Sequence, residues 1–106
     1  MCALISHLPH VVANVFAFQV YREDQNFSRF AGSSFRDFTR IAGSSPIIWL
    51  DIFLTNRDQI VAAIEDLEEG LRYMKDLVKR QDEAGLMTYL DQVKKLKEQV
   101  DRYDPL

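Results

Sequence analysis

Apolar residues recur every three or four positions along the second half of the chain. The first run has spacings of four, three, four, three and four residues, in Ile60, Ile64, Leu67, Leu71, Met74 and Val78. The second run repeats the pattern in Leu86, Leu90, Val93, Leu96 and Val100. This periodicity predicts two long amphipathic helices, with Asn56 and Asp82 as their caps. Because only a short turn separates the helices, we expect an antiparallel hairpin.

The burial of this hairpin is open to two interpretations. Its apolar faces can pack within one chain, or they can form the seam of a dimer with a second copy. Charged residues on the other faces, such as Glu68 and Lys94, are typical of solvated helix surfaces. The periodicity alone does not choose between the two interpretations.

The first half of the chain predicts shorter helices. An apolar helix up to about Tyr21 is kinked or begun at Pro9, because proline is tolerated in a first turn and breaks hydrogen bonds deeper in a helix. Short helices are expected over residues 27–31 and 35–42, each followed by a glycine. Ser45-Pro46 is a start signal for a further helix, with serine as the cap.

No part of the sequence alternates apolar and polar residues between turn signals, as an exposed strand would. The predicted fold class is therefore all-α, with a short-helix N-terminal half and a long antiparallel helix hairpin at the C-terminus. The length of 106 residues and the ordinary composition, 47% hydrophobic and 27% charged, predict a single all-α domain over residues 1–106.

Features of the N-terminus bear on the cellular location. The single Cys2 cannot form an internal disulfide, which fits a reducing environment. The chain lacks the basic segment of a secretion signal, and Pro9 and His10 interrupt its apolar run. We therefore expect a cytoplasmic protein with no membrane segment.

The charge is unevenly distributed between the two halves. The net charge of -3 disfavours a general nucleic-acid binder, so no nucleic acid is expected as a partner. Residues 1–57 contain five basic residues, all arginine, whereas all five lysines lie in residues 58–106. Arginine without lysine, in a segment that is also rich in phenylalanine, suggests recognition of an anion with fixed geometry.

The only two histidines, His7 and His10, stand three residues apart in the stretch SHLPH. They share roughly one helix face, but zinc needs at least a third protein ligand, and none stands at a suggestive spacing, so no metal site is predicted. Acid–base catalysis would need an orienting carboxylate, for which Asp37 and Asp51 are candidates by type only. Hydrogen bonds to the backbone at a helix start are the structural alternative for either histidine.

A second group of candidate residues lies in FAGSSFRDFTRIA, residues 30–42. A guanidinium can hold a carboxylate through two parallel hydrogen bonds, and Arg36 and Arg40 stand one helical turn apart. Either arginine could face a ligand while the other pairs with Asp37 or Asp51. The alternative is a surface cluster of ion pairs, which contributes little energy.

Three separated motifs together resemble one family. SHLPH (residues 6–10), FAGSSFRDFTRIA (residues 30–42) and WLDIFLTN (residues 49–56) are similar, in this order, to the C-terminal helical domain of prephenate dehydrogenase. The resemblance covers nearly the whole chain. It implies an intertwined homodimer, and an N-terminal Rossmann domain that binds NAD or NADP and lies outside this sequence. It also implies oxidative decarboxylation of prephenate to 4-hydroxyphenylpyruvate, on the route to tyrosine.

The resemblance also implies roles for individual residues. His7 is similar to a substrate-contacting histidine, and Arg40 to an arginine that holds a prephenate carboxylate. Asp37 is similar to a residue that orders this arginine or closes the site across the dimer. His10 and Trp49 match motif positions with less defined roles, and His10 is interpreted as structural support for His7.

Departures from the full enzyme limit the predicted activity. The sequence has no G-x-G-x-x-G fingerprint, and the main catalytic histidine of the family belongs to the N-terminal domain. We therefore expect this chain alone to hold no cofactor and to be inactive. One alternative is a stand-alone dimerisation or regulatory module that senses tyrosine, since tyrosine often inhibits the family. Another is an all-α chorismate mutase, which is disfavoured because the basic residues of the long helices occupy the solvated faces.

Overall fold

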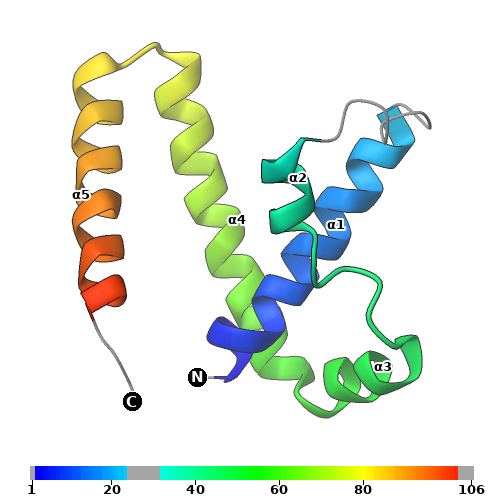
Figure 1. Ribbon diagram of the computed structural model, residues 1–106. Helices are drawn as coiled ribbons and strands as arrows, with labels where there is room; N and C mark the ends of the chain where they lie inside the picture. The colour runs from blue at the N-terminus through cyan, green and yellow to red at the C-terminus, as the bar shows by residue number, and fades with distance from the viewer. Residues whose placement is uncertain (1, 24–31, 103–106) are drawn as a thin grey trace. The chain divides into compact units, whose positions relative to one another are not determined.

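The computed structural model describes residues 2–23 and 32–102, apart from the side chains of Ser33 and Ser34. Its elements follow the order η1 (Ala3–His7), α1 (Leu8–Glu23), α2 (Ser33–Phe38), α3 (Pro46–Thr55), α4 (Arg57–Lys79) and α5 (Glu83–Arg102) (Figure 1). Every element is a helix, which confirms the predicted all-α fold with its two long C-terminal helices. The chain divides into two compact units, Met1–Asp66 and Leu67–Leu106, and α4 continues from the first into the second.

The sequence predicted a helix kinked or begun at Pro9, and α1 begins at Leu8, so Pro9 lies in its first turn. The helix runs on through Pro9, and the turn before the proline is widened into the π-helical segment η1. The backbone N–H of Leu8 donates to the carbonyl of Ala3, five residues earlier. Because proline has no N–H to donate, the adjoining turn must rearrange, and a single π-helical turn is a common way to do so. His7 therefore ends an irregular turn rather than lying within a regular helix.

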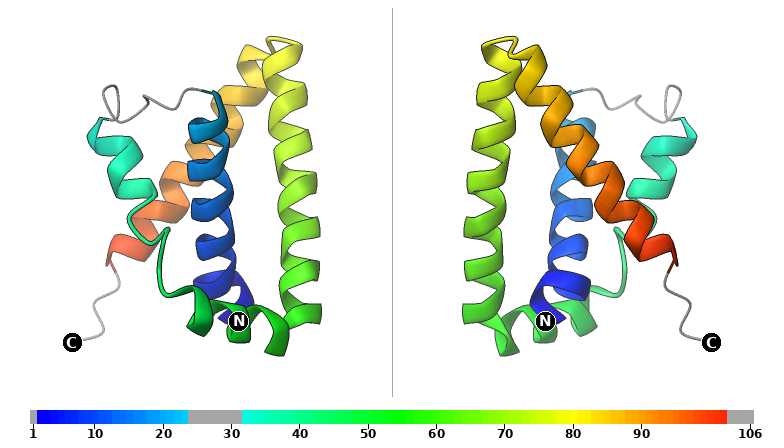
Figure 2. Two further views of the ribbon diagram at one scale, coloured as in Figure 1. Left: turned by 90° about the vertical axis from the view of Figure 1, so that its right-hand side faces the viewer. Right: turned by 90° about the vertical axis from the view of Figure 1, so that its left-hand side faces the viewer.

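Small side chains allow the helices of the first unit to pack closely. Ala13 on α1 is only 1% exposed, and Ala3, Ile60 and Ala63 form the centre of a buried cluster. Partly buried residues packed against this cluster come from α1, α3 and α4, namely Leu8, Val11, Phe53 and Ile64. Figure 2 shows α3 lying across the N-terminal end of α1. This packing positions the start of α1 against α3 and the first turns of α4.

Of the two short helices predicted in the first half, one can be compared with the structure. The one expected over residues 27–31 lies outside the described residues. The one expected over 35–42 begins at Ser33 and ends four residues early, at Phe38. Both the backbone N–H and the hydroxyl of Thr39 donate to the carbonyl of Phe35, and tighter turns follow up to Gly43, whose φ of 79° suits glycine. On α1, Phe16 contacts the rings of Phe35 and Phe38, which holds α2 beside α1.

The second unit contains the predicted hairpin. Asp82 caps α5 as expected, because its carboxylate accepts a hydrogen bond from the backbone N–H of Gly85 at 2.9 Å. Leu77, near the end of α4, is buried at 2% exposure, and the rings of Tyr73 and Tyr89 meet with centroids 5.6 Å apart. Helix α5 contains no buried residue.

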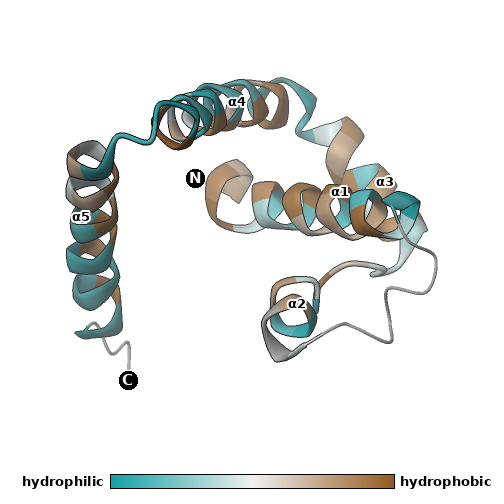
Figure 3. Ribbon diagram, turned by 90° about the horizontal axis from the view of Figure 1, so that it is seen from above, coloured by the Kyte–Doolittle hydropathy of each residue, from teal (hydrophilic) through white to brown (hydrophobic). Residues whose placement is uncertain are grey.

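The hairpin stripes are therefore only partly buried within one chain, at Ile60 and the residues packed near it. On α4, Leu71 and Val78 are exposed, and Leu77 is buried instead. Figure 3 shows apolar residues along α5. Four of them, Leu90, Val93, Leu96 and Val100, are exposed. Of the two interpretations left open by the sequence, burial within the chain does not account for these residues.

The continuous helix also bears on the prediction of no membrane segment. Pro9 and His10 do not interrupt it, so Ala3–Glu23 is long enough, with a mean hydropathy of 1.3 in its most apolar window, to cross a bilayer by length and composition. The core helix of a soluble domain passes the same test. Only 11% of the window is buried in the structure, where the helix contacts α2, α3 and α4.

Candidate functional site

His7 is held by a residue far away in sequence. The amide Nδ2 of Asn56 lies 3.1 Å from Nδ1 of His7, and both side chains are half-buried. Asn56 is the single residue between α3 and α4. The sequence indicated Asn56 as a helix cap, but its amide reaches back to the end of η1 instead.

The two histidines share one aromatic neighbour, Trp49 on α3. The imidazole of His10 stacks on the indole with ring centroids 3.6 Å apart and planes at 21°. His7 meets the same indole edge-on, at 5.9 Å and 88°. On the other side of His10, Nδ1 lies 3.0 Å from the carbonyl oxygen of Ser6. The prediction of a backbone hydrogen bond therefore describes His10, while His7 has a side-chain partner.

Asn14 extends this arrangement along α1. Its amide donates to the carbonyl of His10 at 2.7 Å, and its oxygen lies 3.5 Å from the backbone N–H of Gly43. The turn after α2 is thereby tied to the helix that carries both histidines. A depression of about 360 Å³ adjoins this contact, lined by Asn14, Gly43, Ser44, Pro46, Trp49, Leu50 and Phe53.

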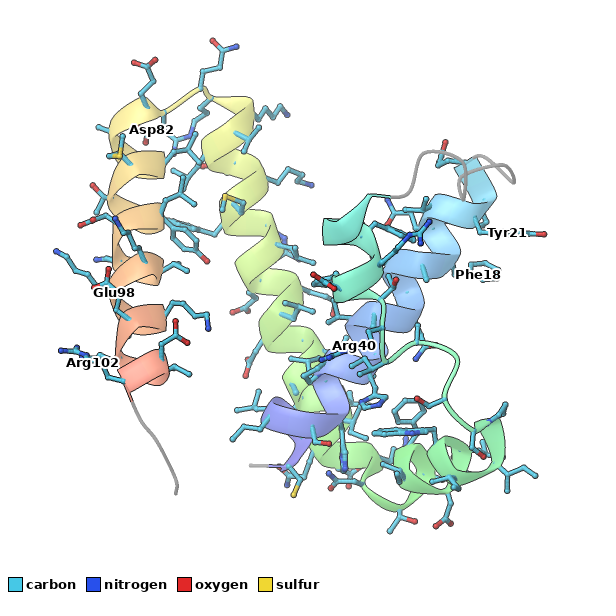
Figure 4. All side chains as sticks on the ribbon, viewed as in Figure 1. Phe18, Tyr21, Arg40, Asp82, Glu98 and Arg102 are labelled. Atoms are coloured by element: carbon cyan, nitrogen blue, oxygen red, sulfur yellow. The ribbon has the colours of Figure 1, made fainter. Side chains whose placement is uncertain are left out.

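Asp37 and Arg40 line a different depression, of about 450 Å³, beside α1. Its other lining residues are Leu4, Leu8, Pro9, Val12, Phe38 and Ile41. Both charged residues are exposed, and Figure 4 shows Arg40 beside the helix. The backbone N–H of Arg40 donates a hydrogen bond of 3.4 Å to the carbonyl of Asp37. Among the described residues, neither side chain has an ion-pair partner.

The structure thus arranges the sequence candidates in two groups around α1. His7 and His10 meet at Trp49, and Asp37 and Arg40 meet at the second depression. No hydrogen bond or ring contact between the two groups is found in the described part of the chain. Asp51 is exposed and makes no hydrogen bond to either histidine there.

Two residues of this site escaped the sequence analysis. Asn56 is 49 residues from His7, and Asn14 is 29 residues from Gly43, so no local spacing could reveal either contact. For Asn56, the role of a helix cap already explained an asparagine at a helix boundary, so its sequence position gave no sign of a contact with His7. As for metals, no three side chains of His, Cys, Asp or Glu converge in residues 2–23 and 32–102.

Comparison with known proteins extends these observations. Residues 1–92 match the family model described as "Prephenate dehydrogenase, dimerization domain". The chain is 35% identical over 95 residues to the prephenate dehydrogenase of Bacillus subtilis, which covers 87% of this chain and 26% of that protein. It is 31% identical over 97 residues to the cyclohexadienyl dehydrogenase of Zymomonas mobilis, which covers 88% of this chain and 33% of that protein.

Two solved structures share the fold. The prephenate dehydrogenase from A. aeolicus, in complex with hydroxyphenyl propionate and NAD+, superposes with a TM-score of 0.86 at 37% identity, over 93% of this chain and 36% of that one. The arogenate dehydrogenase of Synechocystis superposes with a TM-score of 0.85, over 93% of this chain and 37% of that one. At 23% identity, this likeness supports the fold and nothing beyond it. The chain spans about a quarter to a third of the curated relatives. It belongs to the prephenate dehydrogenase family and matches that family's dimerization domain.

Proposed function

We propose that the chain forms the substrate-binding and dimerisation part of a cytoplasmic prephenate dehydrogenase. In this reaction, NAD or NADP accepts a hydride from prephenate, the ring carboxylate leaves as carbon dioxide, and 4-hydroxyphenylpyruvate is formed for tyrosine synthesis. The A. aeolicus neighbour binds hydroxyphenyl propionate, a phenol with a carboxylate, which has the same chemistry as the product. Hydride transfer belongs to the nucleotide, so the contribution of this chain is binding and orientation.

The observation that carries the proposal is the exposed Arg40 at the depression beside α1, whose side chain has no ion-pair partner in residues 2–23 and 32–102. A guanidinium without an ion-pair partner among the described residues can hold a carboxylate of prephenate through two hydrogen bonds. Asp37 lines the same depression and is proposed to restrict where Arg40 points. His7 is proposed to contact another oxygen of the substrate, with His10 and Trp49 as its support.

The nucleotide is proposed to bind to another domain. NAD is usually held by a glycine-rich turn between a strand and a helix. The described residues form helices and turns, and the four glycines of the sequence do not make a G-x-G-x-x-G motif. The donors present here therefore do not fit a dinucleotide by that route.

The exposed face of α5 supports the dimerisation part of the proposal. An amphipathic helix with no buried residue leaves a long apolar surface in water, which marks an interface in a stable protein. A second copy of this chain offers the same stripe and would cover it. The family model that matches the chain carries the word dimerization in its description.

A charge in this stripe should weaken the dimer. We expect Val93→Glu to raise the dimer dissociation constant at least about tenfold, because a carboxylate would lose water in the interface. Thr88→Glu is the matched control, since it also replaces a β-branched residue by glutamate but lies five positions away, on the other side of α5. Analytical ultracentrifugation measures both constants. Equal constants for the two variants would place the interface elsewhere.

Division of the site between two domains can be tested by assembly. We expect neither this chain nor the nucleotide-binding domain of the Bacillus subtilis relative to turn over prephenate alone. A fusion of the two should do so, followed by the absorbance of NADH. The proposal fails if the folded fusion binds hydroxyphenyl propionate no better than the nucleotide-binding domain alone.

The same assembly tests the regulatory alternative. Calorimetry compares tyrosine with hydroxyphenyl propionate as ligands of the dimer formed by this chain. Binding of tyrosine alone, without any turnover in the fusion, would favour a tyrosine-sensing module. The exposed apolar face of α5 is compatible with that function as well.

A further inference from the structure

The contact between Asn56 and His7 determines which nitrogen of His7 carries hydrogen. The amide nitrogen of Asn56 lies 3.1 Å from Nδ1 of His7. An amide nitrogen always carries its hydrogens and does not accept, so Nδ1 must offer its lone pair. The hydrogen of the neutral imidazole is then on Nε2.

His10 is held in the opposite form. Its Nδ1 lies 3.0 Å from the carbonyl oxygen of Ser6, which can only accept a hydrogen bond. Nδ1 of His10 therefore carries the hydrogen. Two histidines three residues apart on one helix thus have different tautomers, each fixed by its own partner.

We propose that Asn56 is a positioning residue that holds His7 as the Nε2–H tautomer and so makes it a hydrogen-bond donor to an oxygen of the substrate. This inference rests on the proposed role of His7 in the substrate site. Carboxylate oxygens accept hydrogen bonds and cannot donate them, so a carboxylate-bearing ligand needs a donor here. Without Asn56, nothing in the described structure would select that form of the ring.

The place of Asn56 in the fold suits this role. Its backbone N–H donates to the carbonyl of Ile52 at 3.0 Å, and its own carbonyl accepts from the N–H of Ile60 at 3.1 Å. The residue is thereby fixed to the last turn of α3 and the first turn of α4 at once. Trp49, about two turns earlier on α3, limits rotation of the His7 ring through the edge-on contact. Both ends of the hydrogen bond are therefore held by packed helices.

Nitrogen NMR of the imidazole rings tests the proposal directly. The chain has only two histidines, so two sets of ring signals are expected. At about pH 9, well above the usual titration range of imidazole, His7 should show the shifts of an Nε2–H ring and His10 those of an Nδ1–H ring. In Asn56→Asp the new carboxylate can only accept, so His7 should change to Nδ1–H while His10 stays unchanged.

Control variants separate this effect from general disturbance. Asn14→Asp makes the same chemical change at a residue that contacts the backbone of His10 and neither imidazole nitrogen, so both tautomers should persist. Should Asn56→Asp fail to fold by circular dichroism, Asn56→Ala replaces it, and His7 should then show a mixture of both forms. The proposal is overturned if wild-type His7 is Nδ1–H or mixed, or if the variant at position 56 leaves His7 unchanged.

A kinetic measurement connects the tautomer to the substrate. In the active fusion described above, Asn56→Asp should raise the KM for prephenate about tenfold, the effect of losing one hydrogen bond to a charged group, with the KM for NAD unchanged. An altered tautomer with an unaltered KM for prephenate would overturn the role toward substrate. Because the NMR experiment needs no substrate, its result is independent of whether the chain serves a dehydrogenase.

Discussion

Replacing Arg40 by alanine should raise the KM for prephenate about a hundredfold in the assembled enzyme, with the KM for NAD changed less than about twofold. Two charge-assisted hydrogen bonds to one carboxylate account for an effect of this size, about 3 kcal/mol. The nucleotide is unaffected because its site is proposed to lie in the other domain. Steady-state kinetics with each substrate varied in turn provide the measurement.

Arg36 offers a matched control for this experiment. It is an exposed arginine on α2, four residues before Arg40, and it does not line the depression that contains Asp37 and Arg40. Arg36→Ala removes the same charge, so it should leave the KM for prephenate within about twofold of wild type. Arg40→Lys should fall between, since it keeps the charge but loses the fork of donors. If Arg40→Ala raised the KM for prephenate and the KM for NAD equally, the role of Arg40 would be structural.

The helices with strong periodicity were predictable from sequence. Helix α4 begins directly after the expected cap Asn56, and α5 begins directly after Asp82. Both follow from local rules, because a helix needs only a repeating apolar face and a boundary residue. Ser45-Pro46 set the start of α3 in the same way, although the serine side chain makes no cap hydrogen bond.

The irregular elements were less predictable, for physical reasons that can be named. The sequence placed a helix start or a kink at Pro9, but it did not predict the π-helical turn η1 that precedes α1. The helix after Gly32 ended early, at Phe38, where shorter-range bonds such as that from the Ala42 N–H to the Thr39 carbonyl replace the helical ones. Each outcome depends on competition between nearby hydrogen bonds, which a periodic pattern does not encode.

The candidate site was predictable as a set of residue types but not as contacts. The sequence singled out His7, His10, Asp37 and Arg40, and the structure places them in two groups around α1. Their roles toward substrate remain predictions. The contacts that define the histidine group come from Trp49 and Asn56, which are more than 35 residues away from it in sequence. Tertiary packing alone creates such contacts, which is why the spacing of the two histidines could not reveal their partners.

Trp49 should therefore contribute more to the stability of the fold than its motif position alone suggested. The indole contacts His10, His7 and Phe53, the last with ring centroids 5.6 Å apart. We expect Trp49→Ala to lower the free energy of unfolding by about 2 to 3 kcal/mol, since a large, partly buried aromatic residue and its ring contacts are lost. Urea unfolding of the full chain followed by circular dichroism measures this, because the only tryptophan is itself removed.

Two variants make this prediction specific to the ring contacts. Trp49→Phe keeps an aromatic face against His10 and should lose less than half as much stability. Leu50→Ala shortens an exposed neighbour that lines the same depression but stacks on neither histidine, so its cost should stay below about 1 kcal/mol. In Trp49→Ala the ring protons of His10 should also shift, because the stacked indole no longer shields them. If Trp49→Ala were as mild as Leu50→Ala and the His10 signals stayed in place, the indole would not be the support of the histidine pair.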